Sequence, residues 1–175
     1  MLRGINVGGN RRVPMAELRA LLTGSGYEDV ATYVQSGNIV LSADVATTEL
    51  ESSVSALISE RFGFDVPVVG RTASELADVL ALDPLGEVVT DPKRYQVSFL
   101  AAPVADEVRA RLQVAVAEPE QLAFAGREIY AWHPDGVARS KLWNALAGTG
   151  LGVVSTARNW RTVTTLGQMA SSTSG

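Results

Sequence analysis

Hydrophobic positions in the first half of the chain recur with two periods, and their order predicts a βαββαβ arrangement. Apolar residues two apart predict four short strands, over Leu2–Val7, Val30–Gln35, Asn38–Ser42 and Val66–Val69. Apolar residues three and four apart predict two helices, one from Met15 to Leu22 and one from Leu50 to Phe62. Strand, helix, hairpin, helix and strand in this order are typical of a ferredoxin-like unit.

The same order returns in the second half. A strand of alternating residues runs from Tyr95 to Phe99, and a hairpin is formed by Gln121–Ala125 and Glu128–Trp132. Two helices are predicted between the strands, one from the spacing of Val104, Val108 and Leu112 and one from that of Leu142, Trp143 and Leu146. A last helix holds Trp160, Val163 and Leu166. The predicted fold is α+β, with two tandem ferredoxin-like halves whose antiparallel sheets are covered by helices.

Turn and capping residues predict the boundaries. Residues 1–82 form an N-terminal half with a linking helix, 93–170 form a C-terminal half, and 171–175 form a flexible tail. The junction 83–92 holds two prolines, a glycine and three acids. Capping boxes are predicted at Thr48 with Glu51 and at Thr72 with Glu75. Arg71-Thr72 and Arg158-Asn159 follow similar glycine-containing segments at the same distances, which supports an internal duplication.

The amino-acid composition of the chain excludes several classes of protein. Of the 175 residues, 46% are hydrophobic and 19% are charged, which is ordinary for a globular protein. No apolar stretch is long enough to span a membrane, and the N-terminus lacks the apolar region of a signal peptide. The absence of cysteine excludes disulfides and thiolate chemistry, so we expect a cytoplasmic protein. The oligomeric state is open, with a monomer slightly favoured.

Charge and histidine content narrow the chemistry further. A net charge of −4 and a pI near 5.0 argue against a broad nucleic-acid-binding surface, although a local basic pocket remains compatible with them. His133 is the single histidine, so a multi-histidine metal site is excluded and a Ser-His-acid triad would have to use it. Its place at a strand end before Pro134 predicts an ordinary surface histidine. We expect no cofactor and no metal.

Five short segments in this order resemble the domain of unknown function 1697 family over nearly the whole chain. They are Leu2-Arg3-Gly4-Ile5-Asn6-Val7-Gly8-Gly9, Tyr33-Val34-Gln35-Ser36-Gly37-Asn38-Ile39-Val40, Gly63-Phe64-Asp65-Val66-Pro67-Val68, Asp135-Gly136-Val137-Ala138-Arg139-Ser140-Lys141-Leu142 and Ala157-Arg158-Asn159-Trp160. The resemblance implies a tandem ferredoxin-like fold and implies no activity. Members usually begin several residues earlier, which raises the alternative that Met1 is a truncated or misassigned start, and they usually have a glycine at the position of Ala138.

Four polar segments are the candidates for a site. Gly8-Gly9-Asn10-Arg11-Arg12 precedes a helix and suits an anion, or is a flexible loop with solvated arginines. Arg139-Ser140-Lys141 suits a phosphate or carboxylate, or is an N-cap between exposed cations. Arg158-Asn159-Trp160 offers a base-stacking surface, although a cap and a core tryptophan are the better interpretation. Gln35-Ser36-Gly37-Asn38 is most economically a turn.

The leading hypothesis is a protein that binds an anionic ligand, such as a nucleotide, phosphate or RNA segment, through these loops where the halves meet. The residues assigned to ligand binding are Arg3, Asn6, Gly8, Gly9, Asn10, Gln35, Ser36, Asn38, Arg139, Ser140, Lys141, Arg158, Asn159 and Trp160. The first alternative is an enzyme that uses Arg3, Arg139, Lys141 and Arg158 for electrostatic stabilisation, with no identified nucleophile or base. The second alternative is a protein-interaction module.

Overall fold

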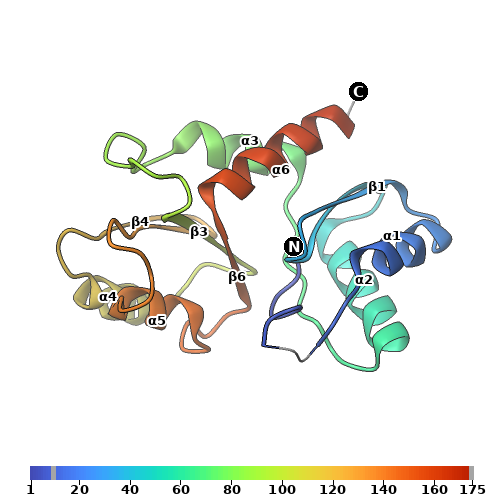
Figure 1. Cartoon of the computed structure of the whole chain (residues 1–175), viewed down its shortest axis with the longest axis horizontal. Helices are drawn as coiled ribbons and strands as arrows, with labels where there is room; N and C mark the ends of the chain where they lie inside the picture. The colour runs from blue at the N-terminus through green and yellow to red at the C-terminus, as the bar shows by residue number, and fades with distance from the viewer. Residues whose placement is uncertain (9–10, 174–175) are drawn as a thin grey trace. The chain divides into compact units, whose positions relative to one another are not determined.

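The chain folds into two compact units (Figure 1). The structure is a computed structural model, and it describes residues 1–8 and 11–173. Unit 1 comprises Met1–Leu76 and Leu166–Gly175, and unit 2 comprises Ala77–Thr165. Helices α3 (Ala73–Leu82) and α6 (Trp160–Thr173) each contribute residues to both units. The fold is mixed α+β, with two antiparallel sheets and six α-helices among the described residues.

Unit 1 is built on a two-stranded antiparallel sheet of β1 (Glu28–Tyr33) and β2 (Asn38–Ser42). Helices α1 (Met15–Gly24) and α2 (Thr47–Phe62) pack on it. Their apolar faces and the inner residues of the sheet form one core, whose buried members are Leu2, Ile5, Val13, Met15, Leu18, Leu22, Val54, Ile58 and Val66. Burial of these side chains is the main stabilising contribution in this unit.

Two predicted strands of unit 1 are nearly absent. In place of strands over residues 2–7 and 66–69, the structure has isolated bridges, one of which joins Leu2 and Val68 in antiparallel direction. The backbone turns away at Gly4 and Asn6, whose φ angles are +67° and +54°. A strand cannot continue through left-handed backbone, and Pro67 has no N–H to donate to a ladder. The alternating apolar pattern is present, but it forms isolated bridges and backbone hydrogen bonds instead of a long ladder.

Unit 2 contains a four-stranded antiparallel sheet. Its elements follow in the order β3 (Tyr95–Leu100), α4 (Asp106–Ala115), β4 (Gln121–Ala125), β5 (Glu128–Trp132), α5 (Lys141–Ala147) and β6 (Ser155–Asn159). The strands lie side by side as β4-β5-β3-β6, so that the first strand of the unit is central. In the register, Val97 is opposite Tyr130 on one side and Arg158 on the other. The hairpin boundaries agree with those predicted from alternation.

Both faces of this sheet are buried. Leu100, Ile129 and Ala131 face α4 and α5 and form the core of the unit with Leu112 and Leu142. On the opposite face, the side chains of Tyr95, Val97, Phe99 and Tyr130 are also buried. The ring of Tyr95 stacks on that of Trp160 at the start of α6, with 4.9 Å between the ring centroids. Trp160 therefore packs against the sheet, which agrees with its interpretation as a core tryptophan.

Helix ends differ from the predictions at two places. Helix α2 begins at Thr47 with Ala46 as its N-cap and no side-chain cap, so the box predicted at Thr48 does not form. Helix α6 continues to Thr173, so three residues of the predicted flexible tail, 171–173, are helical, and the remaining two lie outside the described residues. In the last turn of this helix, the hydroxyls of Ser171 and Thr173 donate to backbone carbonyls four residues earlier. Within the part of the chain described, no helix is both long and apolar enough to cross a membrane.

Candidate functional site

The residues predicted to bind a ligand are divided between the two units. Unit 1 holds Arg3, Asn6, Gly8, Gln35, Ser36 and Asn38. Unit 2 holds Arg139, Ser140, Lys141, Arg158, Asn159 and Trp160. Gly9 and Asn10 lie outside the described residues. That all of these residues meet in one cleft stays a prediction.

Asn6 ties two loops of unit 1 together. Its Nδ2 donates to the carbonyl of Val13 at 2.9 Å and to that of Gln35 at 2.8 Å, and its Oδ1 accepts from the amide of Val13 at 2.9 Å. The side chain thus substitutes for a strand partner where the backbone has turned away. The amide group of Asn6 is fully used in holding the loops.

The segment Gln35–Asn38 is the turn between β1 and β2. Asn38 is buried, and its Nδ2 donates to the carbonyl of Tyr33 at 3.2 Å and to Oγ of Ser36 at 2.9 Å. Gly37 has a φ of +74°, which favours glycine. These contacts agree with the turn interpretation, in which the polar residues hold backbone.

Two of the candidates in unit 2 are helix caps. Oγ of Ser140 accepts from the amide of Trp143 at 2.8 Å at the start of α5, and Oδ1 of Asn159 accepts from the amide of Thr162 at 2.9 Å at the start of α6. Arg139 and Lys141, on either side of Ser140, are exposed. These hydrogen bonds support the interpretation of Ser140 and Asn159 as helix caps.

Arg158 is a buried cation. Its side chain is 8% exposed, and its Nη1 donates to Oγ1 of Thr156 and to the carbonyl of Ala157, each at 2.7 Å. Burial lowers the pKa of Arg158 to about 10, because a charged group is less stable away from water. Its position within the sheet face makes it part of the folded core of unit 2.

A buried polar cluster in unit 2 was missed by the sequence analysis. His133 was predicted to lie on the surface, but it is fully buried, and its Nδ1 lies 2.7 Å from Oε1 of Glu120. Oγ of Ser140 lies 3.3 Å from the same nitrogen, and the rings of His133 and Trp143 form a T-shaped pair with 5.9 Å between their centroids. Strand β5 ends at Trp132, so His133 continues inward from a buried strand, and a histidine before a proline gives no sequence signal for this.

The geometry of this cluster is that of a structural network. In a catalytic triad the nucleophile faces Nε2 and the acid faces Nδ1, whereas Ser140 and Glu120 both approach Nδ1 of His133. Nε2 is buried and has no hydrogen-bond partner among the described residues. Burial raises the pKa of Glu120, but hydrogen bonds from Ser140 and His133 outweigh it, and the pKa lies below its ordinary value.

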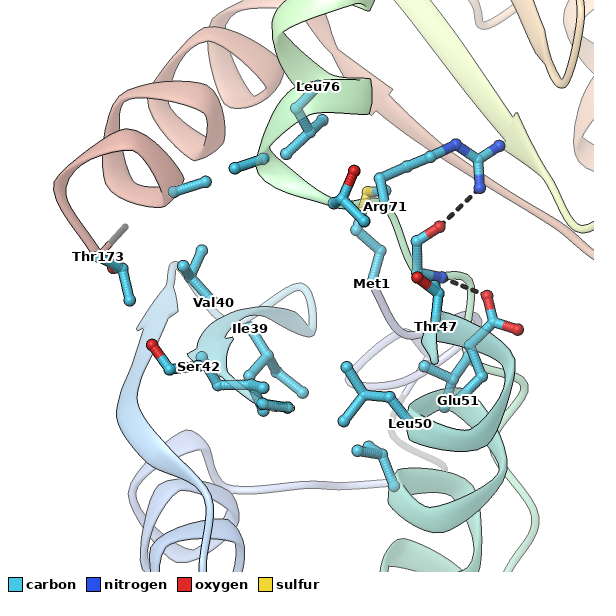
Figure 2. A pocket seen from close by; sticks show the side chains of 18 of the residues that line it. Met1, Ile39, Val40, Ser42, Thr47, Leu50, Glu51, Arg71, Leu76 and Thr173 are labelled. Carbon is cyan, nitrogen blue, oxygen red and sulfur yellow. Dashed lines mark hydrogen bonds between the residues drawn. The ribbon is translucent and has the colours of Figure 1, made fainter. Parts of the chain in front are cut away.

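The candidate site is a cavity of about 360 Å³ in unit 1. Figure 2 shows Val40 and Ser42 of β2 on one side of it and Thr47 and Leu50 of α2 on the other. Val68 and the segment 70–73 form a further wall, and the end of α6 closes the cavity with Leu166, Ala170 and Thr173. The lining residues come from separate segments and include many ordinary core residues, so no sequence motif indicates the cavity.

The wall of the cavity is more apolar than polar. The side chains that line it include Leu50 and Val54 of α2 and Leu166 and Ala170 of α6, and its polar groups are mostly hydroxyls such as that of Ser42. Two charged residues are turned to the backbone of Gly70 (Figure 2). Oε1 of Glu51 accepts from the Gly70 amide at 2.6 Å, and Nη1 of Arg71 donates to the Gly70 carbonyl at 2.6 Å. The cavity therefore suits an uncharged or largely apolar ligand.

No group of three acidic or histidine side chains placed to hold a metal ion occurs among the residues that the structure describes.

Comparison with known proteins gives a family and a fold. The family described as a protein of unknown function, DUF1697, matches residues 1–130. The solved structure of the conserved bacterial protein SP0830 from Streptococcus pneumoniae is similar, with a TM-score of 0.77 and 26% sequence identity, over 97% of this chain and 96% of that one. No curated protein matches the chain.

Proposed function

The chain belongs to the DUF1697 family of proteins of unknown function, and we propose that it is a binding protein for a largely apolar ligand. The cavity of about 360 Å³ in unit 1 carries the proposal. Its volume lies within the range of about 300–1,000 Å³ that is usual for ligand pockets. A wall that is more apolar than polar favours a ligand that gains from leaving water.

A neutral fluorescent dye, Nile red, tests this proposal. The expected result is a blue-shifted, saturable emission with a Kd in the micromolar range of about 1–100 µM. Ala170→Trp places an indole into the cavity from α6 and should weaken dye binding at least about tenfold. Ala110→Trp, at an exposed position of α4 in unit 2, is the matched control and should leave binding unchanged. Failure of the dye to bind the folded protein would contradict the proposal.

A second candidate is the binding of an anion at the loops predicted from sequence. It is supported by the exposure of Arg139 and Lys141, which leave two positive charges in solvent on either side of the cap of α5. Thermal shift at low salt against phosphate, nucleotides and short RNA tests it. Stabilisation that is lost in the double variant Arg139→Gln, Lys141→Gln would support an anion site, and no stabilisation by any of these ligands would contradict it.

The order of elements supports two ferredoxin-like halves from a common plan. Unit 2 has the order βαββαβ with its first strand central, as the ferredoxin-like arrangement requires. In unit 1, the hairpin of β1 and β2 and helix α2 correspond to the hairpin and second helix of unit 2. The Leu2–Val68 bridge lies where the first and last strands of such a unit would pair. Thr72 and Asn159 cap α3 and α6 at corresponding points of the two halves.

A further inference from the structure

Strand β4 is an accessible edge of the sheet in unit 2. The strands follow one another as β4-β5-β3-β6, so β4 and β6 are the two edge strands of this sheet in the described chain. Three of the five residues of β6 are buried, whereas no residue of β4 is. The edge of β4 is therefore the more exposed of the two, and it belongs to a different unit from both ends of the described chain, which are in unit 1.

This edge lacks the features that usually keep a strand from pairing with another molecule. Natural sheets protect their edges with charged side chains, prolines or bulges. The sequence of β4 is Gln-Leu-Ala-Phe-Ala, which contains no charge and no proline. Its register with β5 is regular over all five residues, without a bulge. The edge is therefore suited to the addition of another strand.

Two residues of β4 direct their backbone N–H and C=O groups to the free edge. Strands β4 and β5 are joined by a two-residue turn, 126–127, and the residues that flank such a turn, Ala125 and Glu128, form a hydrogen-bonded pair. Hydrogen-bonded and non-hydrogen-bonded pairs alternate along an antiparallel ladder. The backbone groups of Leu122 and Phe124 therefore point away from β5.

The side chains of β4 follow a similar order in both directions from Ala123. In an antiparallel pairing of two copies about a two-fold axis at this residue, Ala123 faces Ala123 of the other copy, and Leu122 faces Phe124. Leu122 and Phe124 are the residues with free backbone groups, so each of these pairs forms two hydrogen bonds. The pair on the axis is the closer kind, with Cα atoms about 4.5 Å apart, and the small alanine side chain suits it.

The two faces of the strand also suit this pairing. Leu122 and Phe124 pack on the core of unit 2, on the sheet face of Ile129 and Ala131. A pair of Leu122 and Phe124 across the axis continues this apolar row from one copy to the next. A two-fold axis also brings like residues close together, and β4 has no charge that would be repelled by its own copy.

From these relations we propose that β4 binds β4 of a second copy of this chain, which joins the two four-stranded sheets into one continuous antiparallel sheet. This inference goes beyond the proposed function and does not depend on the cavity in unit 1. Because the paired strands are only five residues long, the dimer is expected to be reversible, with a Kd of about 10–100 µM.

The first test measures association and its location in the natural chain. In sedimentation equilibrium from about 5 µM to about 500 µM, the apparent mass should rise from the monomer value of 18.5 kDa towards twice that value. Over the same range, hydrogen exchange of the amides of Leu122 and Phe124, followed by NMR, should slow at least about threefold. The amides of Ala123 and Ala125 point to β5, so they are the internal control and should change much less.

The second test changes the residue on the proposed axis. Ala123→Lys and Ala123→Glu each place like charges opposite one another, so either variant alone should dimerise at least about tenfold more weakly than the natural chain. An equimolar mixture of the two variants places opposite charges there and should recover the dimer. Ala110→Lys, at an exposed position of α4, is the control for added charge and should associate as the natural chain does.

The remaining outcomes overturn the proposal. A mass that stays at 18.5 kDa over the whole range excludes the dimer. A dimer in which the amides of Leu122 and Phe124 exchange as fast as in the monomer uses another surface. Two folded Ala123 variants that stay monomeric when mixed exclude the pairing about this residue. If either variant fails to fold, the exchange of the natural chain decides between the outcomes, because it needs no substitution.

Discussion

The amide of Leu2 and the carbonyl of Gly37 are joined by a 2.8 Å hydrogen bond that connects the start of the chain to the hairpin of unit 1. The approach is close, because a Cβ added at Gly37 would lie 2.7 Å from Cβ of Leu2 and 2.9 Å from Cδ1 of Ile5. Gly37 also has a φ of +74°, which side chains rarely adopt. The position requires glycine for two separate reasons.

Gly37→Ala should therefore lower the free energy of unfolding by about 2–4 kcal/mol, measured by urea denaturation. Gly63→Ala is the matched control. Gly63 ends α2 with a φ of +78°, but an added Cβ there meets open space. This control should lose only the conformational part, about 1–2 kcal/mol. Equal losses in the two variants would show that the contact with Leu2 and Ile5 does not contribute.

Asn6→Asp should destabilise unit 1. The carboxylate can still accept from the amide of Val13, but it cannot donate to the carbonyls of Val13 and Gln35, and it places a negative charge beside both oxygens. The expected loss in the free energy of unfolding is about 2–3 kcal/mol, measured by urea denaturation. Asn144→Asp, at an exposed position of α5, controls for the added charge and should change stability by less than about 1 kcal/mol. A variant of Asn6 as stable as this control would contradict the bridging role.

Glu120→Gln should weaken the acid sensitivity of the protein. The pKa of Glu120 is lower in the folded chain than in the unfolded one, where it is about 4.3. Its contribution to stability is therefore present above about pH 4.3 and is lost as the pH falls through the lower folded value. Between about pH 5 and pH 3, the melting temperature should fall more steeply with decreasing pH in the natural protein than in Glu120→Gln.

The control for this comparison is Glu87→Gln, at an exposed position of unit 2. It removes the same charge without touching His133 or Ser140, and its acid profile should follow that of the natural protein. A Glu120→Gln profile parallel to both would show that the hydrogen bonds from Ser140 and His133 do not favour the ionised carboxyl.

Much of the secondary structure follows from local patterns. The hairpin of β4 and β5 has the predicted boundaries, because strict alternation and a Gly-Arg turn specify its register locally. The outer strands of unit 1 could not be predicted correctly in the same way. Residues 2–7 alternate as a strand does, but the backbone has positive φ at Gly4 and Asn6, and the Asn6 side chain binds the carbonyl of the distant Gln35. Local propensity contains no such information.

The candidate site was less predictable than the fold. Polar loop residues attract attention in a sequence, yet Asn6, Asn38, Ser140 and Asn159 each hold backbone in the structure. The cavity is instead lined largely by apolar side chains such as Leu50, Val54 and Leu166, which a core also uses. Such side chains come from four separate segments of the chain, so short motifs give no indication of the cavity.

The two predicted capping boxes give a direct test of which local signals the fold uses. At α3, the amide of Glu75 donates to Oγ1 of Thr72 at 3.1 Å and the amide of Thr72 donates to Oε2 of Glu75 at 2.8 Å, so this box is closed in both directions. Thr72→Ala should lower the free energy of unfolding by about 1 kcal/mol, measured by urea denaturation. The matched control is Thr48→Ala, because Thr48 is exposed within α2 and the Glu51 carboxylate accepts from Gly70 instead. That variant should stay within about 0.5 kcal/mol of the natural protein. A loss at Thr48 as large as that at Thr72 would mean that the sequence signal, and not the observed hydrogen bond, determines the stability of the helix start.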